Sequence, residues 1–193
     1  KVYTEPFGFN TYDYSREHVF SSSWMPDSAT SDSPPYSDQH NLLPTNLTQV
    51  NIPRSNHPLG IVVNVQSQYL DGKLGTDANG NTVYEPRDGT KGDVARAIFY
   101  MTTAYNGWAG QSWAWNSLNG SRVQDQDQQL LKDWHFNDLP DGRDMARNDF
   151  LDTLQNNRNP FVDHPEYVCH IDFATMTKIT NTTGPCAPVS LDP

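Results

Sequence analysis

The apolar residues of this chain follow two different periods, and the change between them limits the fold more than any other feature. From Ile61 to Tyr69 apolar and polar residues alternate for several positions, which is typical of a half-buried strand. Two turn signals follow, Asp71-Gly72 and Asn79-Gly80, and predict a small hairpin. From Thr90 the apolar residues instead recur at helical spacing, as Val94, Ala95, Ala97, Ile98, Met101 and Tyr105, before Gly107. We therefore expect an α+β fold.

The other elements are assigned by local signals. Thr90 and Asp93 have the spacing of a capping box at the start of that helix. A second helix is expected around Leu130, Leu131 and Trp134, and a third after the N-cap Asp141, with Met145, Leu151 and Leu154 facing inward.

The first fifty residues predict extended structure, a loop and a short helix. Residues 1–20 are expected to form a hairpin that ends at His18, with Gly8 and Asn10 between two extended runs. A long surface loop is expected over residues 21–37, which are rich in Ser, Pro, Asp and Thr. A helix capped by Thr45 is expected next, and it is short or kinked because Pro53 removes an internal hydrogen bond.

Size and composition predict one folded domain over residues 1–193. The chain has a mass of 21.8 kDa and a hydrophobic fraction of only 35%, but its 5 Trp, 9 Tyr and 8 Phe supply large buried areas. No stretch approaches the roughly 18 apolar residues that span a bilayer. We therefore expect a soluble protein, and because the sequence opens on Lys1 rather than on a methionine, we expect it to be processed or truncated.

The two cysteines, Cys169 and Cys186, lie close together in a loop-rich tail, residues 168–193. A disulfide that ties down this tail is the preferred interpretation and fits an exported protein. Two unrelated free thiols are the alternative, because two cysteines say little about the compartment.

The net charge of -10 argues against a nucleic-acid partner, since phosphate binding normally needs a basic face. The cations are not spread evenly, however. Several of them lie in the segments that carry unusual motifs, which leaves a basic cleft on an acidic protein open. They are Arg16, Arg54, Lys91, Arg96 and Arg158.

Glu17 and His18 form the most suggestive chemical pair in the sequence. A carboxylate suits a hard cation such as magnesium, and a neutral imidazole takes a proton from water near pH 7. Taken alone the pair is weak evidence for a catalytic site, because adjacent side chains of a strand point to opposite faces. The amide oxygen of Asn51 would join Glu17 on one cation if the helix after Thr45 packs across the hairpin. Magnesium needs few protein ligands, because it keeps several waters.

Five sequence blocks then extend the pattern along nearly the whole chain. They are Ser15-Arg16-Glu17-His18-Val19, Ser37-Asp38-Gln39-His40-Asn41-Leu42-Leu43-Pro44, Val50-Asn51-Ile52-Pro53-Arg54-Ser55-Asn56, Lys91-Gly92-Asp93-Val94-Ala95-Arg96, and Asn157-Arg158-Asn159-Pro160-Phe161-Val162-Asp163-His164-Pro165. In these blocks, their order and their spacing, the chain resembles the bacterial endonuclease I family. Those proteins are secreted or periplasmic nucleases of the His-Me finger (ββα-metal) superfamily.

The resemblance implies a ββα-metal core of hairpin plus helix, with additional helices and a small antiparallel sheet. It implies that His18 is the general base and that Glu17 and Asn51 bind Mg²⁺, in whose place Ca²⁺ or Mn²⁺ is an option. Arg54 and Arg158 would lie near phosphates, a role suited to guanidinium groups. The expected protein is a secreted or periplasmic bacterial monomer that cleaves DNA, RNA or both with little sequence specificity. The products would carry 5′-phosphate and 3′-hydroxyl ends.

The sequence also departs from the family pattern. Some periplasmic members have a glutamate where this chain has Tyr36, so any metal-binding or base-orienting role of that acid is missing unless Asp38 compensates. An N-terminal segment found in many relatives is expected to be absent. An inactive, nuclease-like secreted binding module remains the alternative function, which the acidic charge favours and the retention of Glu17, His18 and Asn51 opposes.

Overall fold

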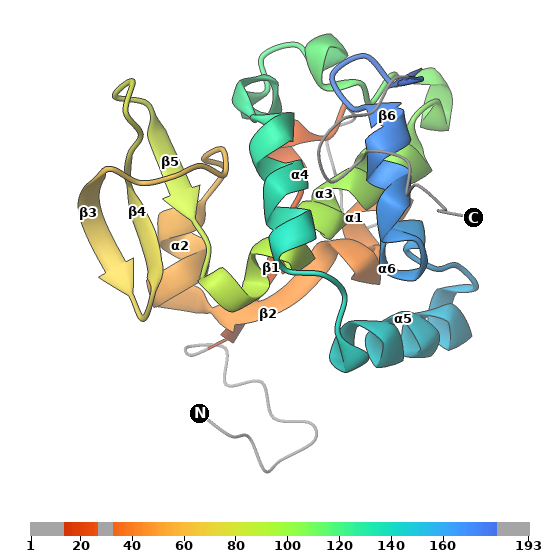
Figure 1. The fold of residues 1–193 in the computed structure, drawn as a ribbon, viewed down its shortest axis with the longest axis horizontal. Coiled ribbons are helices and arrows are strands. Elements are labelled where there is room, and N and C mark those ends of the chain that lie inside the picture. The colour runs from red at the N-terminus through yellow and green to blue at the C-terminus, as the bar shows by residue number, and fades with distance from the viewer. Residues whose placement is uncertain (1–13, 27–32, 181–193) are drawn as a thin grey trace, which may run out of the picture.

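The computed structural model describes residues 14–26 and 33–180, which form short antiparallel sheets and a group of helices (Figure 1). The strands are β1 (Tyr14–His18), β2 (Leu42–Asn46), β3 (Asn64–Tyr69), β4 (Gly72–Thr76), β5 (Thr82–Glu85), β6 (Ile171–Asp172) and β7 (Thr177–Lys178). The helices are α1 (Pro34–Ser37), α2 (Ile52–Arg54), α3 (Lys91–Tyr105), α4 (Gln128–Asn137), α5 (Gly142–Gln155) and α6 (Pro160–Asp163). This mixture confirms the α+β class.

The strand that ends at His18 pairs with a later segment of the chain. β1 and β2 are antiparallel, with Tyr14 opposite Asn46 and His18 opposite Leu42. The hairpin was expected within residues 1–20, and its first half lies outside the described residues. The observed partner of β1 is β2, a pairing that the sequence did not suggest. The expected loop 21–37 is also partly helical, and it buries Trp24 in a 3-10 turn, Ser22–Trp24.

The second sheet has the predicted strands and turns, but the alternation that suggested a half-buried first strand was misleading, because β3 is exposed up to Gln68 and Val65 is 52% exposed. Its strand order is β3-β4-β5, with antiparallel pairing throughout. The turn between β4 and β5 is closed by Asp77, whose Oδ1 accepts hydrogen bonds from the backbone N–H groups of Asn79 and Asn81. Figure 1 shows this sheet and α2 at one end of the molecule, the longer helices at the other, and β1 and β2 between them.

The core forms around α3, which the sequence predicted with the clearest periodicity. Its side chains Ala95, Ile98, Phe99 and Met101 are fully or almost fully buried. Aromatic rings from distant segments gather on this helix, and Phe99 stacks on Phe173 with 4.3 Å between the ring centroids. The aromatic residues thus supply much of the buried apolar area of the core, as expected for a chain with a low hydrophobic fraction.

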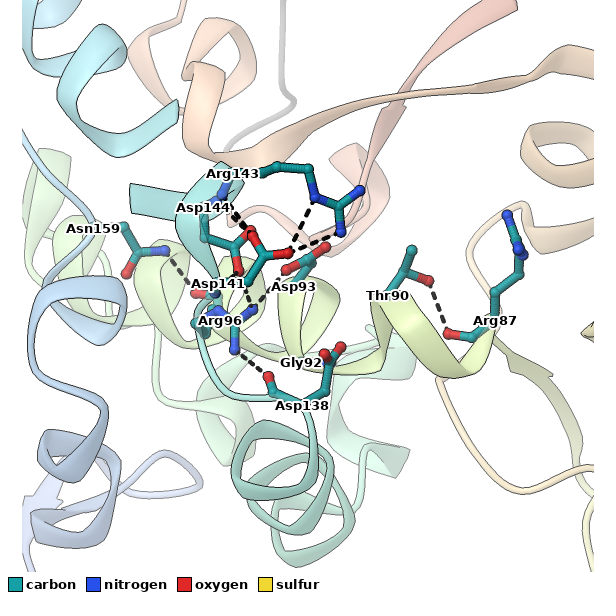
Figure 2. A network of polar contacts seen from close by, with 10 residues as sticks. All are labelled: Arg87, Thr90, Gly92, Asp93, Arg96, Asp138, Asp141, Arg143, Asp144 and Asn159. Carbon is teal, nitrogen blue, oxygen red and sulfur yellow. Dashed lines mark hydrogen bonds and ion pairs between the residues drawn. The ribbon is translucent and has the colours of Figure 1, made fainter. Parts of the chain in front are cut away.

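The start of α3 is held by Arg96 rather than by a capping box. Thr90 is the N-cap residue of α3, as predicted, but its hydroxyl donates to the carbonyl oxygen of Arg87, so the side chain does not form the expected capping bond. Arg96 is buried and donates to Asp93, to Asp144 of α5 and to the carbonyl oxygen of Asp138 (Figure 2). This guanidinium therefore joins α3 to the loop before α5.

Of the two predictions for α5, the one for its N-terminus is confirmed and the one for its buried face is partly wrong. Asp141 caps α5 and forms a capping box with Asp144, as expected for its N-terminus. Leu151 is buried, but the expectation that Met145 and Leu154 also face inward is wrong, because they are 40% and 57% exposed. Since α5 packs through a narrow stripe, the helical spacing alone overestimated its buried face.

The C-terminal part ends in a short 3-10 segment, Pro165–His170, and the β6–β7 ribbon. Cys169 is buried there, whereas Cys186 lies outside the described residues, so the disulfide stays a prediction. Within the described ranges, no helix combines the length and the apolar character required to cross a membrane.

Candidate active site

The site begins at the end of β1, where strand geometry separates two neighbouring side chains. Glu17 points into the protein and is only 7% exposed, whereas the next residue, His18, is half-buried. They lie opposite Leu43 and Leu42 of β2. The strand alternation that weakened this pair as a motif therefore gives its two members different environments.

A short helical segment brings Asn51 back to β1. Thr45 lies in β2, and the helix cap is Asn46, whose Oδ1 accepts from the N–H groups of Thr48 and Gln49, so the predicted cap was wrong by one residue. A π-helical turn, Leu47–Asn51, then runs into α2, which ends at Arg54. The helix is short, as predicted.

Asn51 and Glu17 meet directly. The Nδ2 atom of Asn51 donates to Oε2 of Glu17 at 2.5 Å, although the two residues are 34 positions apart. Burial raises the pKa of Glu17 to about 7, against the opposing effects of the Arg54 charge and the Asn51 hydrogen bond. The neighbours of Glu17 thus compensate only in part for the cost of removing its charged carboxylate from water. A bound cation would reduce that cost further.

Arg54 lies beneath this pair and is only 3% exposed. Its Nε is 3.4 Å from Oε1 of Glu17, and its terminal nitrogens donate to the carbonyl oxygens of Val19 and Ser55. The guanidinium also lies 4.8 Å from the centre of the Trp24 ring. Arg54 therefore fixes the position of Glu17, and contact with a phosphate stays a prediction for this residue.

His18 is oriented by the main chain. Its Nε2 lies 2.8 Å from the carbonyl oxygen of Tyr36, and because a carbonyl only accepts, Nε2 carries the proton. Among the described residues Nδ1 has no hydrogen-bond partner, so its lone pair is available. Burial lowers the pKa of His18, the Tyr36 carbonyl opposes this shift, and the charge of Arg16 adds to it. The ring is therefore uncharged at neutral pH.

Glu17, His18 and Asn51 line one polar cavity of about 390 Å³. Arg16 completes its charged lining, and the other lining residues are Ser21, Ser22, Ser23, Ser55 and Asn56. Arg16 is exposed, and the sequence placed it only among the cations of a basic cleft. Its position beside Glu17 and His18 in one sequence block is a second signal that points to this site.

Arg158 is not among the residues that line this cavity. Its guanidinium donates to both carboxylate oxygens of Asp163, and it also donates to Asp149 of α5. Asp163 in turn accepts from the side chain of Asn148. The structure thus gives Arg158 a place in an ion-pair network between α5 and α6, and its expected contact with a phosphate stays a prediction.

The predicted cation ligands in this cavity are oxygen atoms of the Glu17 carboxylate and the Asn51 amide. Both are hard ligands of the kind that Mg²⁺, Mn²⁺ and Ca²⁺ accept. In the described part of the chain, no group of three or more His, Cys, Asp or Glu side chains is arranged to hold a metal ion. A cation here would therefore have few protein ligands, and it would fit the chemistry of the two that are present.

A family model described as Endonuclease I matches residues 8–166. The chain belongs to the endonuclease I family. It is 38% identical over 168 residues to an extracellular ribonuclease of Bacillus subtilis (strain 168), covering 85% of this chain and 56% of that protein. An extracellular ribonuclease of Bacillus amyloliquefaciens is 34% identical over the same length, which is 85% of this chain and 55% of the relative.

A relative with lower identity is named for a different substrate. An extracellular deoxyribonuclease of Aeromonas hydrophila is 28% identical over 126 residues, which cover 65% of this chain and 49% of that protein. The endonuclease I chain described here thus spans about half the length of the curated relatives that it matches. All five blocks that suggested the family from the sequence fall within residues 8–166.

Proposed function

We propose that this chain is a cation-dependent endonuclease that hydrolyses phosphodiester bonds of nucleic acids. One observation carries the proposal: Glu17, His18 and Asn51, from two separated segments, line a single polar cavity in which Nδ1 of His18 is uncommitted. A base and two hard ligands at one cavity match what metal-assisted hydrolysis requires. Membership of the endonuclease I family and the names of its relatives support the same activity.

In the proposed mechanism the chain's own residues activate water. Nδ1 of His18 accepts a proton from a water molecule while Nε2–H stays bonded to Tyr36. The resulting hydroxide attacks phosphorus in line, the bond to the 3′ oxygen breaks, and that oxygen takes a proton from solvent. The products then carry 5′-phosphate and 3′-hydroxyl ends.

Glu17 and Asn51 would hold the cation, and Arg54 would hold Glu17 in place. When bound, Mg²⁺, or Ca²⁺ or Mn²⁺ in its place, supplies positive charge that stabilises the developing negative charge and the departing oxygen. Asn51 carries an amide oxygen beside the nitrogen that bonds Glu17, and a carboxylate with a raised pKa gains from a cation. We assign the exposed Arg16 a further role, contact with a phosphate of the substrate.

This assignment makes β1, β2 and the helical segment through Arg54 the ββα-metal core of the fold. The antiparallel pair, followed at once by a helix that returns Asn51 to β1, has the expected order of elements. The extracellular relatives support a secreted or periplasmic bacterial protein. Because the relatives include a ribonuclease and a deoxyribonuclease, we propose that both RNA and DNA are cleaved, by a monomer with little sequence specificity.

The net charge of -10 favours a second candidate, a nuclease-like binding module without activity. One assay separates the two. Purified protein is incubated with plasmid DNA and with ribosomal RNA, in Mg²⁺ and in excess chelator, and the new ends are typed by 5′ labelling before and after phosphatase treatment. The enzyme proposal expects cleavage that the chelator abolishes and 5′ ends that are labelled only after phosphatase. Absence of cleavage over a range of salt and metal concentrations would establish the binding module instead.

A further inference from the structure

A second cavity lies on the other side of Glu17 and has no part in the proposed chemistry. It measures about 320 Å³ and is bounded by β1 and β2 on one side and by the ends of β3 and β5 and the start of α3 on the other. Glu17 lines both this cavity and the polar one. A group held here would therefore lie next to whatever is bound at His18.

The walls of this cavity are apolar and aromatic. Val50 and Leu43 contribute from the β2 side, and the rings of Tyr69 and Tyr84 come from the three-stranded sheet. Tyr84 is buried, whereas Tyr69 is half-buried at the end of β3. This lining suits a flat apolar ligand, and the volume is within the range of pockets that hold small molecules.

Two side chains that line the same cavity have hydrogen-bond donors available. Asn46 uses its Oδ1 to cap the following turn, and no described residue bonds its Nδ2. Arg87 uses its Nε to pair with Asp71, and no described residue bonds its two terminal nitrogens. An occupant with an apolar face and hydrogen-bond acceptors on its edge would satisfy both the walls and these donors.

We infer that this cavity binds a nucleobase of the substrate, adjacent to the phosphate that is cleaved at His18. A base has two apolar faces that stack on aromatic rings and an edge with carbonyl and ring-nitrogen acceptors. One sugar joins it to its phosphate, which matches two cavities that share the Glu17 wall. The inference rests on the proposed function. It adds a stacking contact that accepts any base to a site that otherwise contacts the backbone.

The test compares short oligonucleotides that are intact with ones that lack the base on either side of the cleaved bond. Stacking of one base on an aromatic ring is worth roughly tenfold or more in affinity. The wild type is therefore expected to lose about tenfold in kcat/KM when one particular base is removed. Tyr69→Ala should lose about tenfold on the intact substrate and nothing further on the abasic one.

Tyr167→Ala is the matched control, because Tyr167 is partly exposed and stacks on His164 in a segment remote from the cavity. It should behave as the wild type on both substrates. Val50→Phe is the second test variant, for use if Tyr69→Ala does not fold. It narrows the cavity without removing a ring, and it should show the pattern expected of Tyr69→Ala on both substrates. Equal cleavage of intact and abasic substrates by the wild type would overturn the inference.

A binding measurement separates failure of this inference from failure of the nuclease proposal. Adenosine and uridine monophosphates are titrated into wild type and Tyr69→Ala in excess chelator, with ribose 5-phosphate as the base-free probe. If the wild type cleaves nothing but binds a nucleotide at least about tenfold more tightly than Tyr69→Ala does, only the nuclease proposal fails. If it binds the nucleotides no better than ribose 5-phosphate, the nucleobase cavity is refuted.

Discussion

The Nε2 atom of His18 donates to the backbone carbonyl oxygen of Tyr36 across 2.8 Å. This bond decides which ring nitrogen is free to accept a proton. It also answers a question raised by the sequence, in which Tyr36 stands where some relatives have a glutamate. A main-chain carbonyl therefore orients the base without an acid at this position, and the ring of Tyr36 packs on His18 with 4.4 Å between the ring centroids.

The Tyr36 carbonyl is held by the segment that follows it, and Asp38 is the anchor of that segment. Its carboxylate accepts from the hydroxyls of Tyr100 and Tyr105, from Gln155 and from the N–H of His40. Asp38→Asn replaces an acceptor with a donor, and we expect it to lower the free energy of unfolding by about 1–3 kcal/mol and to lower kcat. Tyr105→Phe removes only one partner and should cost less. Denaturant unfolding and cleavage rates check both, and an unchanged kcat in a destabilised Asp38→Asn protein would contradict the positioning role.

Arg54 is predicted to be a residue on which the fold depends. It is fully buried with Glu17, two carbonyl oxygens and the Trp24 ring as partners. Arg54→Met leaves the Glu17 carboxylate without its cationic partner, so we expect a loss of about 3–5 kcal/mol in the free energy of unfolding at pH 8. Arg143→Met, at an exposed ion pair, is the control and should change little. Unfolding curves in guanidinium chloride give both values, and equal losses would contradict this account.

Arg16 and Arg158 make opposite predictions about substrate binding. Arg16 is exposed in the polar cavity, whereas Arg158 is already paired with Asp163 and Asp149. Arg16→Gln is expected to weaken binding of an oligonucleotide and to lower the slope of log Kd against log salt by about one. Arg158→Gln should leave that slope unchanged. The salt dependence, measured in excess chelator so that the oligonucleotide is not cleaved, checks this. A lowered slope for Arg158→Gln would place that residue at a phosphate, as the sequence predicted.

His135 predicts how stability depends on pH. It is buried beside Phe99 and Phe136, its Nε2–H donates to the carbonyl oxygen of Pro165, and its Nδ1 is buried without a partner. Burial lowers the pKa of His135 to about 4 from an ordinary value of 6.5. Between these two values the unfolded state binds the proton and the folded state does not, so stability falls as pH falls.

The contribution of His135 is fully present above pH 6.5 and is lost by about pH 4, a change of about 3 kcal/mol. Asp93, whose pKa is raised to about 6, acts in the opposite direction, so wild type must be compared with a variant. His135→Gln keeps a donor for Pro165 without titrating. Urea unfolding at pH 7 and pH 4 should show a smaller loss for the variant, and equal losses would mean that His135 does not titrate as stated.

Much of this structure follows from local sequence signals, and the errors have identifiable causes. The helix at residues 91–105 was predictable from its apolar periodicity, and the strands at 64–85 from the turn residues between them. The alternation over residues 61–69 did not indicate burial, because β3 is exposed. The partner of β1 was not, because pairing between residues 14–18 and 42–46 is a long-range contact that no local pattern encodes. The same applies to Arg54, whose burial under Glu17 depends on how the short helix packs.

Of the proposed site, the sequence predicted which residues meet but not the geometry between them, and their chemical roles stay predictions. Glu17, His18 and Asn51 were named from their residue types and from the family resemblance, and the structure places all three at one cavity. The free nitrogen of His18 could not be predicted, because it depends on a backbone carbonyl 18 residues away. Main-chain partners leave no trace in the identity of a side chain.

The central claim is that His18 activates water at a cation held by Glu17 and Asn51. The most direct test compares cleavage of plasmid DNA and RNA in Mg²⁺ by wild type and by His18→Ala, with circular dichroism to establish that both are folded. The variant is expected to lose at least about 100-fold in rate, as for a general base, while it still binds an oligonucleotide. Cleavage by folded His18→Ala at the wild-type rate would contradict the account.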